Sequence, residues 1–179
     1  MPAALDPVPL LRHLQEHGVK HIVIGGLAVG AHGHVRPSKD LDIVPDPSRP
    51  NLERLASALA DIDATDAEAG DFDPAELPMS ALRVDDLAQG GNFRLLTELG
   101  DLDILQWASG IDADNLYAEL SCQALEGTVE GVSIRVCGLD HLLAMKRAAG
   151  RPRDLEDIER LTGDRAAAAQ MPSGPPEAS

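Results

Sequence analysis

The sequence predicts a mixed α/β domain, of the α+β class, in which helices flank a small mixed β-sheet. Two patterns support this fold class. Short apolar runs with a period of two recur along the chain, and segments with apolar residues at helical spacing separate them. With 179 residues we expect one domain at 1–164, followed by a disordered tail at 165–179 that is rich in Ala, Pro, Ser and Gly.

The first elements follow from local signals. A helix is predicted from Pro7 to His17, with Asp6 as its N-cap and Gly18 at its end. Lys20 to Gly25 reads as the first strand, and Leu27 to His32 as a short helix. The acidic strand that comes next is therefore joined to the first strand through a glycine turn and one helix.

The acidic strand carries Asp40 and Asp42, which alternate with apolar residues and so project to one face of the sheet. Two carboxylates side by side repel, and burying either without a partner is costly. A divalent cation resolves both problems, and hard oxygen ligands favour Mg²⁺. The turn Gly25–Gly26 lets backbone N–H groups approach a phosphate closely, so the sequence predicts a phosphate cradle and a metal site facing one pocket.

The middle of the chain predicts further elements. A helix begins at Asn51, and the acidic segment from Asp61 to Gly91 is expected to form a surface loop or lid with one helical turn near Ala75–Leu77. Strands are predicted at Phe93–Glu98 and Leu102–Gln106, joined as a hairpin.

The last third completes the sheet and adds helices. A helix is expected at Asp112–Leu120, and a strand pair at Cys122–Leu125 and Val129–Val136. Two terminal helices are separated by Gly150 and Pro152. On the second of these, Asp154 and Asp157 are expected on one side, and Leu155, Ile158 and Leu161 on the other.

Composition restricts the partners and the location. The chain has 30 acidic and 15 basic residues, a net charge of −15, which weighs against a broad nucleic-acid surface but is compatible with a local basic rim. Cys122 and Cys137, expected on separate strands, lack metal-site spacing and read as reduced core thiols. No signal peptide or membrane-length apolar segment is visible, so we expect a cytoplasmic protein without a membrane partner.

The motifs resemble a known superfamily. Gly25–Gly26, a spacer and Asp40-Leu41-Asp42 resemble the signature of the DNA polymerase β-like nucleotidyltransferases. The longer string GGLAVGAHGHVRPSKDLDIV is similar to the AbiEii/MenT-type branch, which is found among bacterial toxin–antitoxin proteins. Gly26 stands where many relatives carry Ser.

The resemblance implies a nucleotidyltransferase fold and a metal-dependent enzyme that moves a nucleoside monophosphate from a nucleoside triphosphate, such as ATP, to an acceptor hydroxyl. It implies that Asp40, Asp42 and a third carboxylate bind Mg²⁺ or Mn²⁺. Asp103 is preferred to Asp101 for that role, because it lies inside its strand between apolar neighbours. Lys146, expected with Arg147 to open toward solvent or substrate, would contact the triphosphate.

Other site residues keep two readings. Arg36 and Ser38 are candidates for nucleotide binding together with Gly25 and Gly26, but Arg36 could equally neutralise the acidic pair. Arg151, Arg153 and either Asp154 or Asp157 would line the edge of the site, whereas Arg153 and Asp157 could instead form an ordinary helix salt pair.

Three functions are consistent with these residues. The resemblance favours a toxin-like enzyme that modifies tRNA or another cellular acceptor and is restrained by an antitoxin. An antibiotic nucleotidyltransferase acting on cationic small molecules such as aminoglycosides suits the acidic charge. A catalytically silent module that binds a nucleotide or a protein partner is the third.

Overall fold

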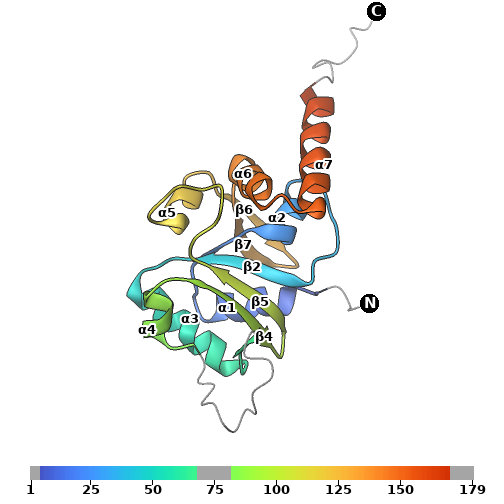
Figure 1. Ribbon diagram of the computed structural model, residues 1–179. Coiled ribbons are helices and arrows are strands. Elements are labelled where there is room, and N and C mark those ends of the chain that lie inside the picture. Colours follow the sequence, from blue (N-terminus) through green and yellow to red (C-terminus); the bar gives the residue numbers. More distant parts are fainter. Residues whose placement is uncertain (1–4, 68–81, 170–179) are drawn as a thin grey trace, which may run out of the picture.

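The structure, a computed structural model, describes residues 5–67 and 82–169, and in these residues the chain forms one seven-stranded mixed sheet flanked by helices (Figure 1). The strands are β1 (His21–Val23), β2 (Asp40–Pro45), β3 (Thr65–Asp66), β4 (Asn92–Thr97), β5 (Gly100–Leu105), β6 (Leu125–Val129) and β7 (Val132–Val136). The helices are α1 (Val8–Glu16), α2 (Gly25–Ala31), α3 (Arg49–Asp61), α4 (Val84–Ala88), α5 (Leu116–Ser121), α6 (Leu139–Ala149) and α7 (Pro152–Ala169). The predicted fold class is confirmed.

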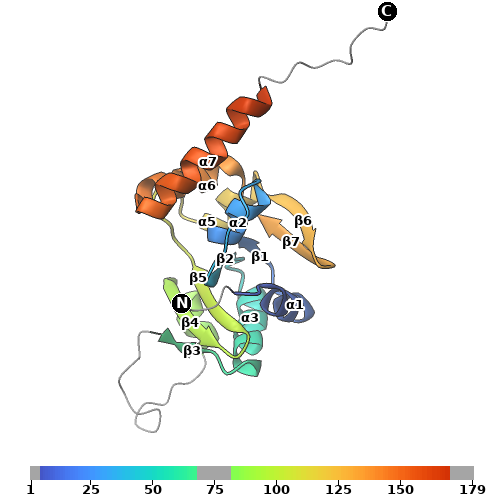
Figure 2. The same cartoon turned by 90° about the vertical axis from the view of Figure 1, so that its right-hand side faces the viewer.

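The strand order is β3-β4-β5-β2-β1-β7-β6. β2 lies at the centre and runs parallel to β5 and antiparallel to β1. The two flanking hairpins, β4–β5 and β6–β7, extend the sheet on either side. Helices α1 and α3 pack on one side of the central strands, and α2 and α6 on the other (Figures 1 and 2). The acidic strand is therefore held between two neighbours and covered by helices.

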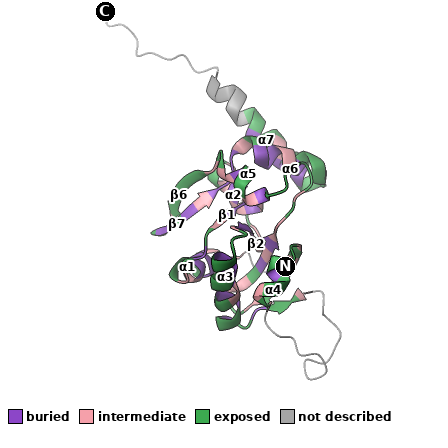
Figure 3. Cartoon of the chain, turned by 90° about the vertical axis from the view of Figure 1, so that its left-hand side faces the viewer, coloured by how far each residue is buried: buried purple, intermediate pink, exposed green. Residues whose placement is uncertain are grey.

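Aliphatic side chains form the core, as the low aromatic content requires. In α1 the apolar positions Leu10, Leu11 and Leu14 are fully buried. The N-cap is Pro7 and not the predicted Asp6, although the Val8 amide donates to Asp6 Oδ1 at 3.0 Å just before the helix. Burial is concentrated on the central strands and the inward faces of the helices (Figure 3). This packing makes β2 a rigid support for its polar side chains.

Several boundaries differ from the expectation. The segment Asp61–Gly91 is not wholly a loop, because its described part contains β3 and α4, and Leu87 of α4 is fully buried. The helical turn expected near Ala75–Leu77 lies outside the described residues. α5 begins only at Leu116, where the Asn115 side chain accepts from the Ala118 amide at 3.0 Å.

The strand predicted at Cys122–Leu125 lies instead at β6. A two-residue turn with positive φ at Glu130 and Gly131 pairs Val129 with Val132 and so sets the register of this hairpin. Cys122 consequently ends α5 and is exposed, which corrects its expected role as a core thiol, whereas Cys137 is buried as expected.

The last helix also packs differently. Leu155 is 57% exposed, whereas Leu161 is buried together with Asp154 and Asp157, so the expected division into an acidic and an apolar side is wrong. The buried stripe of α7 consists of Asp154, Asp157 and Leu161, with Ile158 half-buried, because two carboxylates find cationic partners on this face. α7 continues past residue 164 to Ala169 and projects from the domain (Figures 1 and 2). Residues 170–179 of the predicted tail lie outside the described part.

Within residues 5–67 and 82–169, no helix has the length and apolarity needed to cross a bilayer.

Candidate active site

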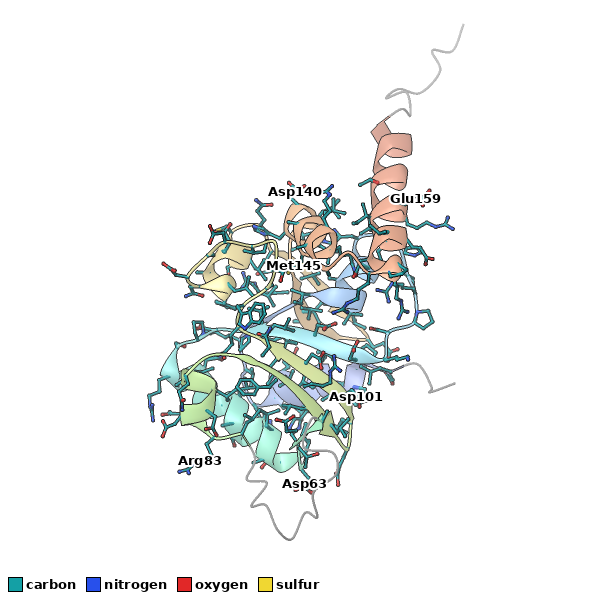
Figure 4. The ribbon with its side chains drawn as sticks, in the orientation of Figure 1. Asp63, Arg83, Asp101, Asp140, Met145 and Glu159 are labelled. Carbon is teal, nitrogen blue, oxygen red and sulfur yellow. The ribbon has the colours of Figure 1, made fainter. Side chains whose placement is uncertain are left out.

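The acidic residues of β2 and β5 meet through strand register. The two strands are parallel, with Asp40 opposite Asp101 and Asp42 opposite Asp103. Asp101 lies at the exposed start of β5 (Figure 4), whereas Asp103 is half-buried. Asp40, Asp42 and Asp103 line one cavity of about 410 Å³, and Asp101 does not. Asp103 therefore lies beside the acidic pair, and its role as the third carboxylate stays a prediction.

The other predicted site residues line the same cavity. They are Gly25, Gly26, Arg36, Ser38 and Lys146, together with Arg151, Arg153 and Asp154 from the segment that begins α7. Asp157, the alternative to Asp154, does not line it. Residues far apart in the sequence are brought together because α2 and the α6–α7 junction meet β2 and β5 on one face of the sheet.

The carboxylates of the cavity lie close enough for the negative charge of one to raise the pKa of another. The pKa of Asp42 is raised to about 7, chiefly by burial and then by the negative charges of Asp40 and Asp103. Burial also raises the pKa of Asp103, although Arg94 opposes this with its Nε 3.6 Å from Asp103 Oδ1. Among the described residues, Asp103 Oδ1 has no hydrogen-bond partner although it is buried. The cationic side chains of the protein thus do not fully offset the negative charge of Asp40, Asp42 and Asp103.

The glycine pair shapes the approach to these carboxylates. Gly25 has φ +63°, and a β-carbon there would collide with the Asp42 carboxylate. The Gly26 amide donates to Asp42, and a β-carbon at Gly26 would lie 2.5 Å from Ser38 Oγ. The helix begins at Gly25 rather than at the expected Leu27. Ser38 therefore fills the space beside Gly26 that a serine side chain would need.

Lys146 was expected to open toward solvent or substrate, and of these two it is shielded from solvent but lines the candidate cavity. It is only 6% exposed, and its Nζ lies 2.9 Å from Asp154 Oδ1 and 2.8 Å from Asp157 Oδ2. Arg147, its neighbour, is exposed as expected. Lys146 thus reaches the cavity as part of an ion-pair network that joins α6 to α7.

Asp157 is the centre of that network. Arg36 donates to it through Nε at 2.7 Å and Nη2 at 2.8 Å, so Arg36 pairs with Asp157 and not with the acidic pair. Burial disfavours the charge on Asp157, but the hydrogen bonds from Arg36 and Lys146 outweigh it and lower its pKa. The alternative helix pair does not form, because Arg153 donates instead to the Pro37 carbonyl at 2.6 Å.

Several residues around the cavity were not expected from the sequence. Arg94 faces Asp103 across the β4–β5 hairpin, and Asn92 and Phe93 line the cavity beside it. The hairpin register could have identified Arg94, because pairing Thr97 with Gly100 places it opposite Asp103. Asp66, from the short strand β3, also lines the cavity, and no motif in the sequence indicates it.

The donor set suits a hard divalent cation that a substrate helps to bind. Within the described ranges, no group of three or more His, Cys, Asp or Glu side chains is arranged to hold a metal ion by itself. Mg²⁺, however, is commonly bound by one or two carboxylates, with water and substrate phosphates completing the shell. Asp40 and Asp42 provide such a pair, and the uncompensated charge around Asp42 favours a cation there.

Comparisons with known proteins identify the fold. The chain is similar in structure to the lincosamide antibiotic adenylyltransferase LnuA, solved with lincomycin bound (16% identity, TM-score 0.59, 89% of this chain and 98% of that chain). It is also similar to ANT(2")-Ia in complex with adenylyl-2"-tobramycin (17%, 0.55, 89% and 87%). A third similar structure is an antigenic nucleotidyltransferase-like protein from Paracoccidioides brasiliensis (15%, 0.54, 91% and 78%). No protein-family model and no curated protein sequence matches the chain.

These structures place the chain in the nucleotidyltransferase fold, as the motifs predicted. At such low identity the likeness concerns the fold alone, and the AbiEii/MenT-type branch stays a prediction from the sequence.

Proposed function

We propose that this protein is a metal-dependent nucleotidyltransferase that transfers a nucleoside monophosphate from a nucleoside triphosphate to an acceptor hydroxyl. One observation carries the proposal. Three carboxylates from adjacent strands, a glycine pair and several cationic side chains line a single cavity of about 410 Å³ in a nucleotidyltransferase fold. A silent binding module would have no need of the mutually repelling Asp40, Asp42 and Asp103.

The carboxylates have distinct roles in this proposal. Asp40 and Asp42 hold Mg²⁺ or Mn²⁺ together with the triphosphate. When bound, the metal supplies positive charge that stabilises the phosphoryl oxygens and the departing pyrophosphate. Asp103 faces the acceptor hydroxyl and takes its proton, a role that suits a carboxyl whose pKa is raised. The hydroxyl oxygen forms a bond to the α-phosphorus, and the bond from that phosphorus to the bridging oxygen of pyrophosphate breaks.

The remaining side chains bind the triphosphate. Gly25 and Gly26 let phosphate oxygens approach the backbone, and Ser38 contributes the hydroxyl that position 26 lacks. Lys146 has three N–H donors, of which two are directed at Asp154 and Asp157, so the third is available to a phosphate. Arg36 lines the same wall and adds positive charge there.

The acceptor separates two versions of the proposal. The sequence resemblance favours a toxin-like enzyme that modifies tRNA or another cellular acceptor and is held inactive by an antitoxin. The net charge of −15 favours a cationic small molecule, and two of the similar structures were solved with lincomycin and with adenylyl-2"-tobramycin bound. An Arg151 and Arg153 rim is the local basic surface that an RNA acceptor would contact.

Incubation with labelled nucleoside triphosphates, Mg²⁺ or Mn²⁺, total RNA and a panel of aminoglycosides and lincosamides tests both versions. Asp42→Asn should reduce transfer at least about 100-fold, because it removes one carboxylate charge from the metal site without changing volume. Asp101→Asn is the matched control, since Asp101 is an exposed aspartate of the neighbouring strand outside the cavity. Equal transfer by wild type and Asp42→Asn would reject the mechanism, and nucleotide binding without any transfer would indicate the silent module.

A further inference from the structure

A second cavity adjoins the candidate active site. It has a volume of about 330 Å³ and shares part of its wall with the polar cavity. The shared residues are Gly25, Asn92, Leu105, Lys146, Arg151 and Asp154. A ligand can therefore occupy both compartments at once and pass between them beside Lys146 and Arg151.

The wall of this second compartment has a different chemistry. Beyond the shared residues it is mainly apolar, with Ile24 from between β1 and α2, Leu142 and Met145 from α6 (Figure 4), and Trp107 from the loop after β5. Trp107 is the only tryptophan of the chain and is 60% exposed. Large exposed apolar side chains at the mouth of a cavity commonly contact ligands.

Trp107 sits on a firmly held loop. The Trp107 amide donates to Asn92 Oδ1 at 3.4 Å, Asn92 Nδ2 donates to the Trp107 carbonyl at 3.2 Å, and the Gln106 amide donates to Asn92 Oδ1 at 3.0 Å. A β-carbon at Gly110 would lie 2.5 Å from the Ala144 carbonyl oxygen, so the loop packs directly on α6. Asn92 thereby fixes the backbone that carries the indole, and little ordering is left for a ligand to impose.

We propose that the second cavity, whose wall contains Trp107 and Met145, receives the nucleobase of the nucleoside triphosphate, with the base against the indole of Trp107. This assignment rests on the proposed function. The triphosphate would run from the compartment past Lys146 and Arg151 to the carboxylates of β2. A nucleobase is planar and only weakly hydrated on its faces, so it suits an apolar wall with an aromatic side chain, whereas the phosphates suit the charged cavity. A cationic acceptor would instead be drawn to the acidic side of the site.

The single tryptophan gives a direct readout. Fluorescence of Trp107 should change in a saturable manner when an ATP analogue with a methylene between the α- and β-phosphorus atoms is added with Mg²⁺. Tripolyphosphate, which has no base, should compete with the analogue in calorimetry without producing that change. Aminoglycosides and lincomycin, added alone as acceptors, should leave the fluorescence unaltered.

Variants separate stacking from general damage. Trp107→Ala should raise KM for the nucleotide on the order of 5- to 100-fold, the range expected for a lost base–aromatic contact, with kcat little changed. Trp107→Phe should recover part of this loss. Leu125→Ala removes an exposed apolar side chain from β6, outside both cavities, and serves as the control.

The outcomes distinguish the two levels of proposal. Suppose that nucleotide binds and is transferred, but that it leaves the Trp107 fluorescence of the wild type unchanged and Trp107→Ala has the KM of the wild type. The base then lies elsewhere, and only this inference fails. A fluorescence change with an acceptor and none with nucleotide would also overturn it. If calorimetry detects no nucleotide binding and no acceptor is labelled, the proposed function itself fails.

Discussion

Asp42→Asn should stabilise the metal-free protein at pH 8 although it removes transfer. The pKa of Asp42 is raised from 3.8 to about 7 in the folded protein, first by burial and then by Asp40 and Asp103. Between these two pH values the folded state binds a proton that the unfolded chain has released, so stability falls as pH rises through this window. Above pH 7 the folded protein carries the unfavourable charge, and asparagine avoids it.

The size of the effect follows from the shift. A rise from 3.8 to about 7 corresponds to about 4 kcal/mol at 1.36 kcal/mol per pKa unit. More than half of this is lost between pH 5 and pH 8, because the rest of the window lies below pH 5. Asp42 is half-buried and lines a cavity that water can enter, so we expect a measured difference of about 1–2 kcal/mol.

Urea unfolding in EDTA at pH 5 and pH 8 measures this difference. The wild type should lose stability from pH 5 to pH 8, and Asp42→Asn should lose less by about 1–2 kcal/mol. Asp101→Asn, exposed on the neighbouring strand, should follow the wild type. Adding Mg²⁺ with the methylene ATP analogue should stabilise the wild type at pH 8 and not the variant. Identical pH profiles for wild type and Asp42→Asn would refute the electrostatic argument.

Three further measurements test other parts of the structure. Asp157→Ala leaves the buried Lys146 and the half-buried Arg36 without their shared partner, so thermal or urea unfolding should show a loss of about 3–5 kcal/mol, whereas an unchanged midpoint would mean that the network contributes nothing. Gly25→Ala forces a side chain into φ +63° and toward a carboxylate, so it should abolish transfer and lower stability by about 1 kcal/mol or more, and wild-type activity would contradict the tight approach. The pKa of His17 is raised by its hydrogen bonds to the His13 carbonyl and to Asp61, so the stability it contributes is present below pH 6.5 and is lost as pH rises through the higher folded value. Asp61→Asn should lower the His17 pKa in an NMR titration, and an unshifted titration would exclude the pair.

Local patterns in the sequence were sufficient to predict the fold class and to name the acidic residues and glycines of the candidate site. Alternation along β2 determines that Asp40 and Asp42 share a face. Position 25 requires glycine because a β-carbon there would collide with the carboxylate of Asp42. The family resemblance implied a third carboxylate, and the pattern of GDLDIL favoured Asp103 over Asp101 because Asp103 lies inside its strand. These features depend on residues within a few positions of one another, which is why the sequence alone determined them.

Only the tertiary structure decided how the charged side chains pair. Lys146 reads as exposed on its own helix, yet it is buried because α7 brings Asp154 and Asp157 against it, and Arg36 turns to Asp157 from a distant loop. Leu155 is exposed for the same reason, because ion pairs occupy the packed face of α7. Electrostatic energies depend on distances between groups and on their burial, and both are set by how separate elements pack, which no local pattern in the chain specifies.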